Sequence, residues 1–190
     1  MKKFTTTLLL AIGLLVGFTV NAQAVSAATL VQTNSGYWYD RAKADGSDHH
    51  SWHFTLYEVD GQVAYCIQPN IPEGTHYNQG SWEDTGLPNS IKERLLLIGY
   101  YGYTYPGHQT LQFRAATQGL IWDTIIGSGA NTTFHTARWA KGDTFDVSNE
   151  KAQIENLIAH HYDRPSFNGG VFKAQVGETI TLTDTNNVLS

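Results

Sequence analysis

The sequence predicts an α+β fold, in which an antiparallel β-layer (a sheet or one layer of a sandwich) is covered by about three helices and followed by the start of a β-domain. Three observations predict it: a hairpin pattern over residues 52–68, three later segments with helical character, and strand-like alternation after residue 168. The composition, with 41% hydrophobic and 15% charged residues, excludes a disordered or collagen-like chain.

The charge balance limits the partners that the surface can attract. The 190 residues contain 12 Lys and Arg against 17 Asp and Glu, for a formal net charge of -5. Non-specific binding to nucleic acid or to an anionic membrane needs a basic surface, so neither is expected as a partner.

The first segment, 1–27, reads as a secretory signal peptide. Lys2 and Lys3 precede an apolar run from Leu8 to Val20, and small residues suited to cleavage follow. The apolar run is shorter than the roughly 20 residues that a membrane helix needs. We therefore expect an exported mature chain that begins near Ala28 and has no membrane segment.

The hairpin is the strongest local pattern. Two β-rich runs flank Asp60-Gly61, a pair typical of two-residue turns. Antiparallel pairing then places Tyr57 opposite Ala64 and Thr55 opposite Cys66. Alternation predicts one core face and one more polar face. The core face would carry Trp52, Phe54, Leu56, Val63, Tyr65 and Ile67, and the other face His53, Thr55, Tyr57, Ala64, Cys66 and Gln68.

Cys66 is the single cysteine of the chain. Exported proteins with disulfide frameworks carry cysteines in even numbers, so no internal disulfide is possible. A buried hydrophobic role, an intermolecular bridge, a catalytic nucleophile and a bond to a non-cysteine side chain all remain open at this point.

Residues 69–88 read as a loop, and three helices follow. The first begins at Asn89 or Ser90 and stops at Gly99, the second runs from Gln109 to Ile126 and stops at Gly127, and the third spans Ser148–His161. Residues 127–133 are expected to form a loop. A tyrosine-rich segment, 100–105, lies between the first two helices and is either a binding surface or half-buried packing.

Gln118 stands inside the apolar stripe of the second helix, among Leu111, Ala115 and Trp122, whereas Gln112 lies off it. A buried amide without partners costs about 1–3 kcal/mol, so Gln118 must serve a purpose, structural or chemical.

After Asn168 the pattern becomes strand-like, through Val171–Val176 and Glu178–Thr183. We expect residues 169–190 to be a linker and the first strands of a following β-domain, and the chain to be the front of a longer protein.

Two motifs resemble those of a known family. Tyr65-Cys66-Ile67 is similar to the aromatic-Cys-aliphatic motif, and Thr117-Gln118-Gly119-Leu120-Ile121-Trp122 to the TQxxΦW motif (Φ, apolar), of the thioester (TQXA) domains of Gram-positive surface adhesins. The resemblance covers roughly residues 30–165, and it places a thioester domain at 28–168. Both motifs, their order along the chain and the expected secretion agree with this family.

This resemblance implies a cell-surface adhesin with a mixed sheet and helical fold and an internal thioester between Cys66 and Gln118. The thioester would react with a lysine amine of a host surface, matrix or plasma protein to give covalent attachment. The reaction is a single-turnover event that needs no cofactor. The resemblance also implies anchoring to the cell wall through a region that this chain does not include.

We expect five residues to support the reaction of Cys66 with Gln118, and the aromatic ones among them to exclude water. They are Thr55, Tyr57, Tyr65, Thr117 and Trp122. Some members of the family carry a later glutamine motif that can supply the acyl group. Gln175 and then Gln153 are the alternates for that role, although neither matches the motif well.

Two other functions stay open. Cys66 could serve a secreted cysteine hydrolase together with His53, His108 or His135, but cysteine hydrolases usually carry the nucleophile at a helix N-terminus. Alternatively, the tyrosine segment could bind a partner without covalent chemistry, with Cys66 inert. A zinc site in residues 48–53 is not predicted, because this His-rich segment lacks helical spacing and thiolate partners.

Overall fold

A computed structural model describes residues 28–69, 85–186 and 188 of the chain. The expected signal peptide (1–27) and most of the expected loop (69–88) lie outside these residues. Within them the elements are β1 (Leu30–Ala42), β2 (His50–Val59), β3 (Gln62–Ala64), α1 (Asn89–Tyr101), α2 (Leu111–Ile126), β4 (Asn131–Ala137), β5 (Lys141–Thr144) and α3 (Ser148–Ala159). Of the helices in the described part of the chain, none is long and apolar enough to cross a membrane.

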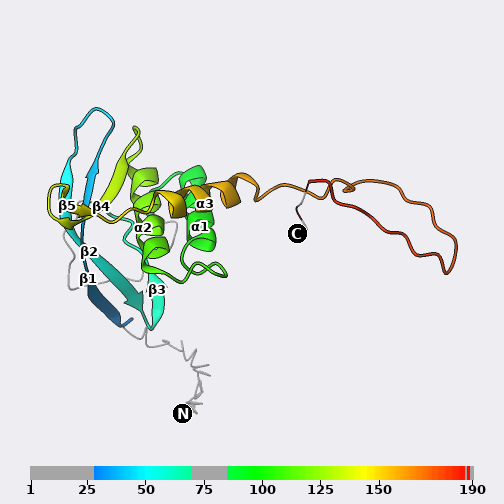
Figure 1. Cartoon of the computed structure of the whole chain (residues 1–190), viewed down its shortest axis with the longest axis horizontal. Helices are drawn as coiled ribbons and strands as arrows, with labels where there is room; N and C mark the ends of the chain where they lie inside the picture. Colours follow the sequence, from blue (N-terminus) through cyan, green and yellow to red (C-terminus); the bar gives the residue numbers. More distant parts are fainter. Residues whose placement is uncertain (1–27, 70–84, 187, 189–190) are drawn as a thin grey trace, which may run out of the picture.

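The strands form one antiparallel sheet in the order β3-β2-β1-β4-β5, with the helices gathered on one side of it (Figure 1). The predicted α+β class, an antiparallel sheet covered by three helices, is confirmed. The two-residue turn is also confirmed, because Val59 pairs with Gln62 and Tyr57 with Ala64. Asp60 and Gly61 both have positive φ, of 50° and 75°, as such a turn requires.

The predicted pairing of Thr55 with Cys66 is wrong, because β3 ends at Ala64. Beyond that residue the chain leaves the sheet, and the backbone N–H and C=O of Cys66 are hydrogen-bonded to the side chain of Gln118 instead of to a strand. Cys66 therefore lies just past a strand end, where its position is set by a helix rather than by β2.

Three strands, β1, β4 and β5, have no counterpart in the sequence predictions. The central strand β1 pairs with β2 on one side and β4 on the other, with a register shift between Asn34 and Trp38 around Gly36, whose φ is 85°. The expected loop over 127–133 is shorter than predicted, because β4 already begins at Asn131 and pairs with β1.

The helices keep their predicted places, with changes at the ends. α1 continues past Gly99 to Tyr101, and a Cβ on Gly102, where it ends, would lie 2.3 Å from Thr117 Oγ1. α2 begins at Leu111 rather than Gln109, because the Thr110 side chain accepts a hydrogen bond from the backbone N–H of Phe113. It ends at Gly127 as predicted. α3 ends at Ala159, two residues before the predicted His161.

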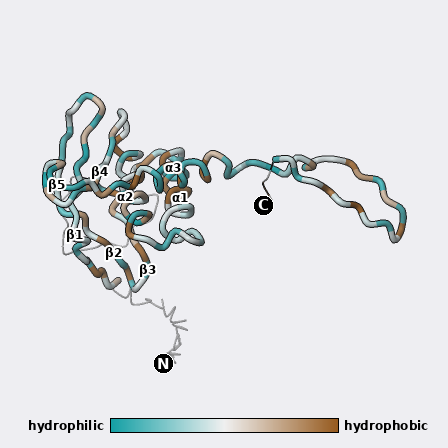
Figure 2. The backbone as a smooth tube through the Cα atoms, viewed as in Figure 1, coloured by the Kyte–Doolittle hydropathy of each residue, from teal (hydrophilic) through white to brown (hydrophobic). Residues whose placement is uncertain are grey.

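The core lies between the sheet and the helices, and Figure 2 shows hydrophobic stretches concentrated in this part of the molecule. Phe54 and Phe134 from the sheet meet with ring centroids 4.9 Å apart, and Ile98 and Ile154 from α1 and α3 are fully buried. Each such side chain contributes about 1.5–3 kcal/mol by leaving water. The predicted core position of Trp52 is wrong: this ring is 54% exposed and lies near Trp38 and outside the core.

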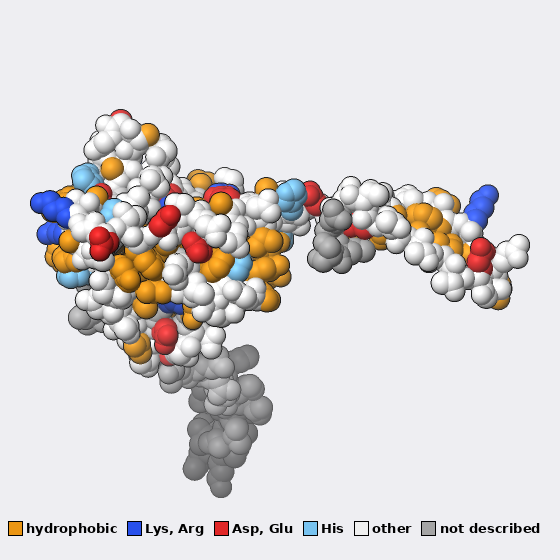
Figure 3. Space-filling model, viewed as in Figure 1, with side chains coloured by type: hydrophobic (Ala, Val, Ile, Leu, Met, Phe, Trp, Pro, Cys, Tyr) orange, Lys and Arg blue, Asp and Glu red, His pale blue; other side chains and the backbone are white. Residues whose placement is uncertain are grey.

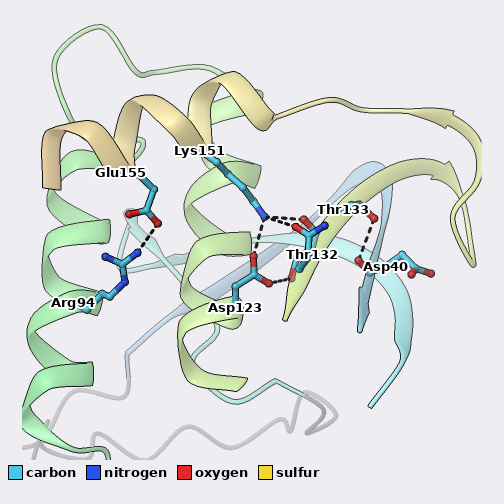
Figure 4. Close-up of polar contacts among 8 residues, drawn as sticks. Asp40, Arg94, Asp123, Thr132, Thr133, Lys151 and Glu155 are labelled. Carbon is cyan, nitrogen blue, oxygen red and sulfur yellow. Dashed lines mark hydrogen bonds and ion pairs between the residues drawn. The ribbon is translucent and has the colours of Figure 1, made fainter. Parts of the chain in front are cut away.

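Ion pairs tie the three helices together (Figure 4). Lys151 Nζ of α3 lies 2.8 Å from Asp123 Oδ2 of α2 and donates to the backbone carbonyl of Thr132 in β4 at 2.9 Å. Arg94 of α1 pairs with Glu155 of α3 at 2.5 Å. These contacts hold α2, which carries Gln118, against both the sheet and its neighbouring helices.

Residues 169–186 extend from the body as a long loop that returns toward its starting point (Figure 1). The backbone N–H of Ser166 donates to the carboxylate of Asp184, and the backbone N–H of Thr185 donates to the Ser166 hydroxyl. These two bonds join the two ends of the loop. The strands predicted here are not formed in the described residues, and Val171 and Val176 are exposed. A strand pair needs further strands or a helix to cover its apolar side, so the assignment of this segment to a following β-domain stays a prediction.

Candidate functional site

Cys66 and Gln118 are brought together by two hydrogen bonds, although 52 positions separate them in the chain. The backbone N–H of Cys66 donates to Gln118 Oε1 at 2.9 Å, and Gln118 Nε2 donates to the backbone carbonyl of Cys66 at 2.8 Å. The amide is thus held in a fixed orientation beside the only cysteine. Gln118 itself is 2% exposed, so its amide is removed from water.

The setting of Gln118 differs from the predicted amphipathic stripe. Every residue of α2 from Phe113 to Trp122 is buried, so the helix is surrounded on all sides at this level. The two hydrogen bonds to Cys66 satisfy both ends of the amide, which explains why a polar side chain is tolerated there. Gln112, predicted to lie off the stripe, is exposed.

Arg114 is a site residue that the sequence predictions missed. Its Nη2 donates to the backbone carbonyls of Tyr57 in β2 and Ala64 in β3, the latter at 3.3 Å. The guanidinium also lies over the rings of Tyr65 and Tyr103, 5.0 and 5.2 Å from their centroids. Arg114 therefore attaches the end of the β2–β3 hairpin, two residues before Cys66, to the helix that carries Gln118.

Burial governs the ionisation of this cluster. It lowers the pKa of Arg114 and raises the pKa of Tyr65, while the nearby guanidinium opposes the rise at Tyr65. The raised pKa keeps Tyr65 neutral at ordinary pH, and a guanidinium such as that of Arg114 stays protonated in proteins. The sequence signal that could have revealed Arg114 is that it is, with Asp123, one of two charged residues in a largely apolar helix.

We predict that Arg114→Met destabilises the protein by about 1–3 kcal/mol, because two carbonyls lose the charged donor that a buried side chain gives them. Arg94→Met is the matched control, since the Arg94–Glu155 pair is more than one third exposed on both sides and such pairs contribute about 0–1 kcal/mol. Urea denaturation of both variants measures the difference. An equal loss in the two variants would contradict the anchoring role of Arg114.

A pocket of about 450 Å³ opens beside Cys66. Its walls come from β1, β2, the β4–β5 turn, α2 and the segment after β3. The lining residues are Tyr39, His50, Ser51, Trp52, His53, Thr55, Tyr57, Cys66, Gln68, Pro69, Trp122, Arg138 and Trp139. The side chains predicted for the polar face of the hairpin thus share one cavity, with the exception of Ala64.

The supporting residues predicted from the sequence divide into two groups. Thr55, Tyr57 and Trp122 line the pocket with Cys66, and the Trp122 ring packs on Tyr39 with centroids 4.5 Å apart. Tyr65 and Thr117 lie outside it.

Thr117 has a structural position instead. Its hydroxyl is fully buried, donates to the backbone carbonyl of Phe113 at 2.6 Å and accepts from the backbone N–H of Tyr103 at 3.1 Å. It therefore fixes the tyrosine segment against α2, one residue before Gln118. Of that segment, Tyr100, Tyr101 and Tyr105 pack on one another, and none of its tyrosines lines the pocket beside Cys66.

The histidines considered for a hydrolase are separated by the fold. His53 lines the pocket of Cys66, with its ring 3.7 Å from Trp38. His108 contacts the backbone carbonyl of Tyr101 and stacks on Phe113, and His135 bonds the hydroxyl of Thr133. His53 is thus the candidate that shares the cavity.

The His-rich segment is engaged in local pairs, since His49 bonds Asp40 at 2.6 Å and His50 bonds Asp48 at 3.1 Å. In residues 28–69, 85–186 and 188, no three His, Cys, Asp or Glu side chains gather in a way that could hold a metal ion.

The alternate glutamines do not approach Cys66 in this arrangement. Gln153 is exposed on α3, and Gln175 is exposed in the C-terminal loop. The amide that contacts Cys66 is that of Gln118.

Comparison with known proteins agrees with this fold. The chain is similar over 85% of its length to a solved structure, the thioester domain of the Staphylococcus aureus TIE protein, of which it covers 67%, with a TM-score of 0.58 and 22% identity. That likeness concerns the fold. A search of curated proteins gives no match. The family model for the thioester domain matches residues 63–163, which include both Cys66 and Gln118 and make up more than half of the chain. The chain therefore belongs to the thioester domain family.

Proposed function

We propose that Cys66 and Gln118 form an internal thioester, and that this bond attaches the protein covalently to a lysine amine of a host protein. The observation that carries the proposal is the pair of hydrogen bonds between the Gln118 amide and the backbone of Cys66. The amide is held beside the residue that carries the potential nucleophile, and family membership supports the same chemistry.

The first step is attack of Cys66 Sγ on the Gln118 amide carbon. As the C–S bond forms, negative charge develops on Oε1, which already accepts a hydrogen bond from the backbone N–H of Cys66. The C–N bond then breaks, and the amide nitrogen takes the thiol proton and leaves as ammonia. The products are one thioester and one ammonia, so the step balances without a cofactor.

The second step is transfer of the acyl group to an amine. A neutral lysine amine attacks the thioester carbon, the C–S bond breaks, and the proton released by nitrogen returns to the Cys66 sulfur. The result is an amide between the partner lysine and the former glutamine side chain. Because the amide is far more stable than the thioester, the attachment is effectively permanent and each molecule reacts once.

The surroundings of the pair suit a bond that must survive in water until a partner arrives. Gln118 is buried, and the Trp122 and Tyr57 rings line the approach to Cys66. A site from which water is excluded protects a reactive acyl group and strengthens the hydrogen bond to its oxygen. Proximity lowers the barrier to formation, since holding well-oriented groups together can remove about 7–11 kcal/mol of the barrier of a bimolecular encounter.

In this proposal the mature chain begins near residue 28, is exported, and is displayed on the bacterial surface through a cell-wall anchor outside the chain. Residues 28–168 form the reactive domain and 169–190 lead into the next one.

The test is the intact mass of freshly purified mature protein. We expect a mass lower than that of the sequence by one ammonia, and no reaction of Cys66 with thiol reagents in the folded state. Hydroxylamine should open the bond and expose one thiol. A full mass with a freely alkylated Cys66 would contradict the proposal. In that case, hydrolysis of ester or amide substrates that is lost in His53→Ala would favour a hydrolase. Absence of any such hydrolysis would favour an inert cysteine.

A further inference from the structure

One wall of the Cys66 pocket is formed by exposed aromatic residues around an arginine. Trp52 of β2 and Trp139 of the β4–β5 turn are 54% and 44% exposed, and the Arg138 guanidinium lies 5.0 and 4.9 Å from their ring centroids. All three line the pocket. Two neighbouring exposed indole rings beside a cavity form a contiguous apolar patch, and such patches mark contact surfaces. We call Trp52, Arg138 and Trp139 the Trp–Arg wall.

The Trp–Arg wall is held rigidly by its contacts with β2. Arg138 Nε donates to the backbone carbonyl of Ser51 at 2.9 Å, and the backbone N–H of Trp139 donates to the Ser51 hydroxyl at 2.8 Å. Trp139 and Ala140 adopt positive φ values of 62° and 52°, a conformation that non-glycine residues rarely take in succession. Tight hairpin turns use such φ values, so the β4–β5 turn itself fixes the place of Trp139 beside β2.

The pocket has the opposite electrostatic character to the whole chain. The chain carries a net charge of -5, yet among the described residues the pocket lining contains no Asp or Glu, and its one permanent charge there is that of Arg138. Lys141 is exposed at the same turn, and Figure 3 shows basic side chains gathered at the end of the molecule that carries β4 and β5.

The nearby carboxylates do not neutralise Arg138. Asp40 pairs with His49 and Asp48 with His50. Among the residues that the structure describes, no ion pair joins Arg138 to a carboxylate. A half-buried guanidinium that lies over neighbouring rings can bind a carboxylate from outside.

We propose that the Trp–Arg wall recognises the acceptor segment of the partner protein, and that it selects a lysine with an acidic residue close by in an extended stretch of chain. This inference rests on the proposed function. A lone lysine would meet the repulsion of Arg138 at the pocket mouth. A carboxylate two residues away lies on the same side of an extended segment, so it can pair with Arg138 while the lysine reaches toward Cys66. In this arrangement the two indole rings pack against the apolar part of the bound segment.

The test compares two synthetic peptides that each contain one lysine and differ at a single position, Asp-x-Lys against Asn-x-Lys. Wild-type protein should form the amide adduct with the Asp peptide about tenfold faster, as expected for one charge-assisted hydrogen bond of ordinary strength. This preference should decline as salt rises, because the pair is close to the surface. The rate is followed by mass spectrometry.

Arg138→Gln should bring the ratio of the two rates close to one, and Arg138→Lys should restore part of the preference. Arg164→Gln, an exposed arginine far along the chain, is the matched control and should keep the wild-type ratio. Equal rates for the two peptides in wild type, or an unchanged ratio in Arg138→Gln, would overturn the inference. The wild-type comparison decides the matter even if the Arg138 variants fold poorly.

Methylamine separates this inference from the proposed function. Wild type that consumes methylamine but does not discriminate between the peptides has a working thioester and no acidic preference, so only the inference fails. Wild type that reacts with neither methylamine nor peptide lacks the thioester, and the proposed function fails first.

Discussion

Cys66→Ala is expected to abolish the ammonia mass deficit and every covalent adduct while leaving the fold intact. The variant removes the nucleophilic sulfur but keeps the backbone N–H and C=O that bond Gln118, so the amide stays in place. Shortening this half-buried side chain should cost about 1–3 kcal/mol, within the 5–15 kcal/mol of a typical domain.

The measurement mixes wild type and Cys66→Ala separately with host plasma and surface proteins, then boils the samples in detergent. Wild type should give a resistant complex in which a partner lysine is joined to the residue at position 118, and Cys66→Ala should give none. Thr55→Ala, which alters a neighbouring pocket residue and no reacting atom, is the control that should retain the complex. A resistant complex in both Cys66→Ala and wild type would contradict the mechanism. A mass deficit in wild type without any adduct across a broad panel would favour a purely structural cross-link.

Gln118→Ala is expected to have an equally complete effect on the mass and a larger one on stability. The acyl donor is removed, so the full mass and a reactive Cys66 thiol should appear. The backbone N–H and C=O of Cys66 also lose their partners, at a cost of about 1–3 kcal/mol. Intact mass and thermal melting of the same samples record both results.

The control for that variant is Gln112→Ala, on the same helix but exposed, which should keep both the mass deficit and the melting temperature. Gln153→Ala and Gln175→Ala should do the same, because their side chains are exposed on α3 and on the C-terminal loop. If the deficit disappears only in Gln175→Ala or Gln153→Ala, the acyl donor has been assigned to the wrong residue.

Several features follow from the sequence alone because they depend on local periodicity and turn chemistry. Asp60-Gly61 determined the register of the β2–β3 hairpin, since two residues with positive φ connect antiparallel strands in one way. Gly127 determined the end of α2. The two motifs around Cys66 and Gln118 indicated the family, which the family model then matched.

Other features required the tertiary structure, because they arise from contacts between segments far apart in the chain. Alternation alone continued β3 through Cys66, whereas the amide of Gln118 takes the backbone groups of that residue and ends the strand at Ala64. The central strand β1 was not predicted, and it owes its place to pairing with β2 and β4 together.

The sequence by itself determined which two residues to suspect, a lone cysteine and a glutamine in the apolar stripe of a helix. Only the tertiary structure decided what surrounds them. Arg114 joins the hairpin to α2 through carbonyls 57 and 50 positions away, and Arg138 enters the pocket wall by bonding Ser51, 87 positions away. No local pattern specifies such partners, because a side chain's role there depends on backbone groups that the fold alone brings within hydrogen-bonding distance.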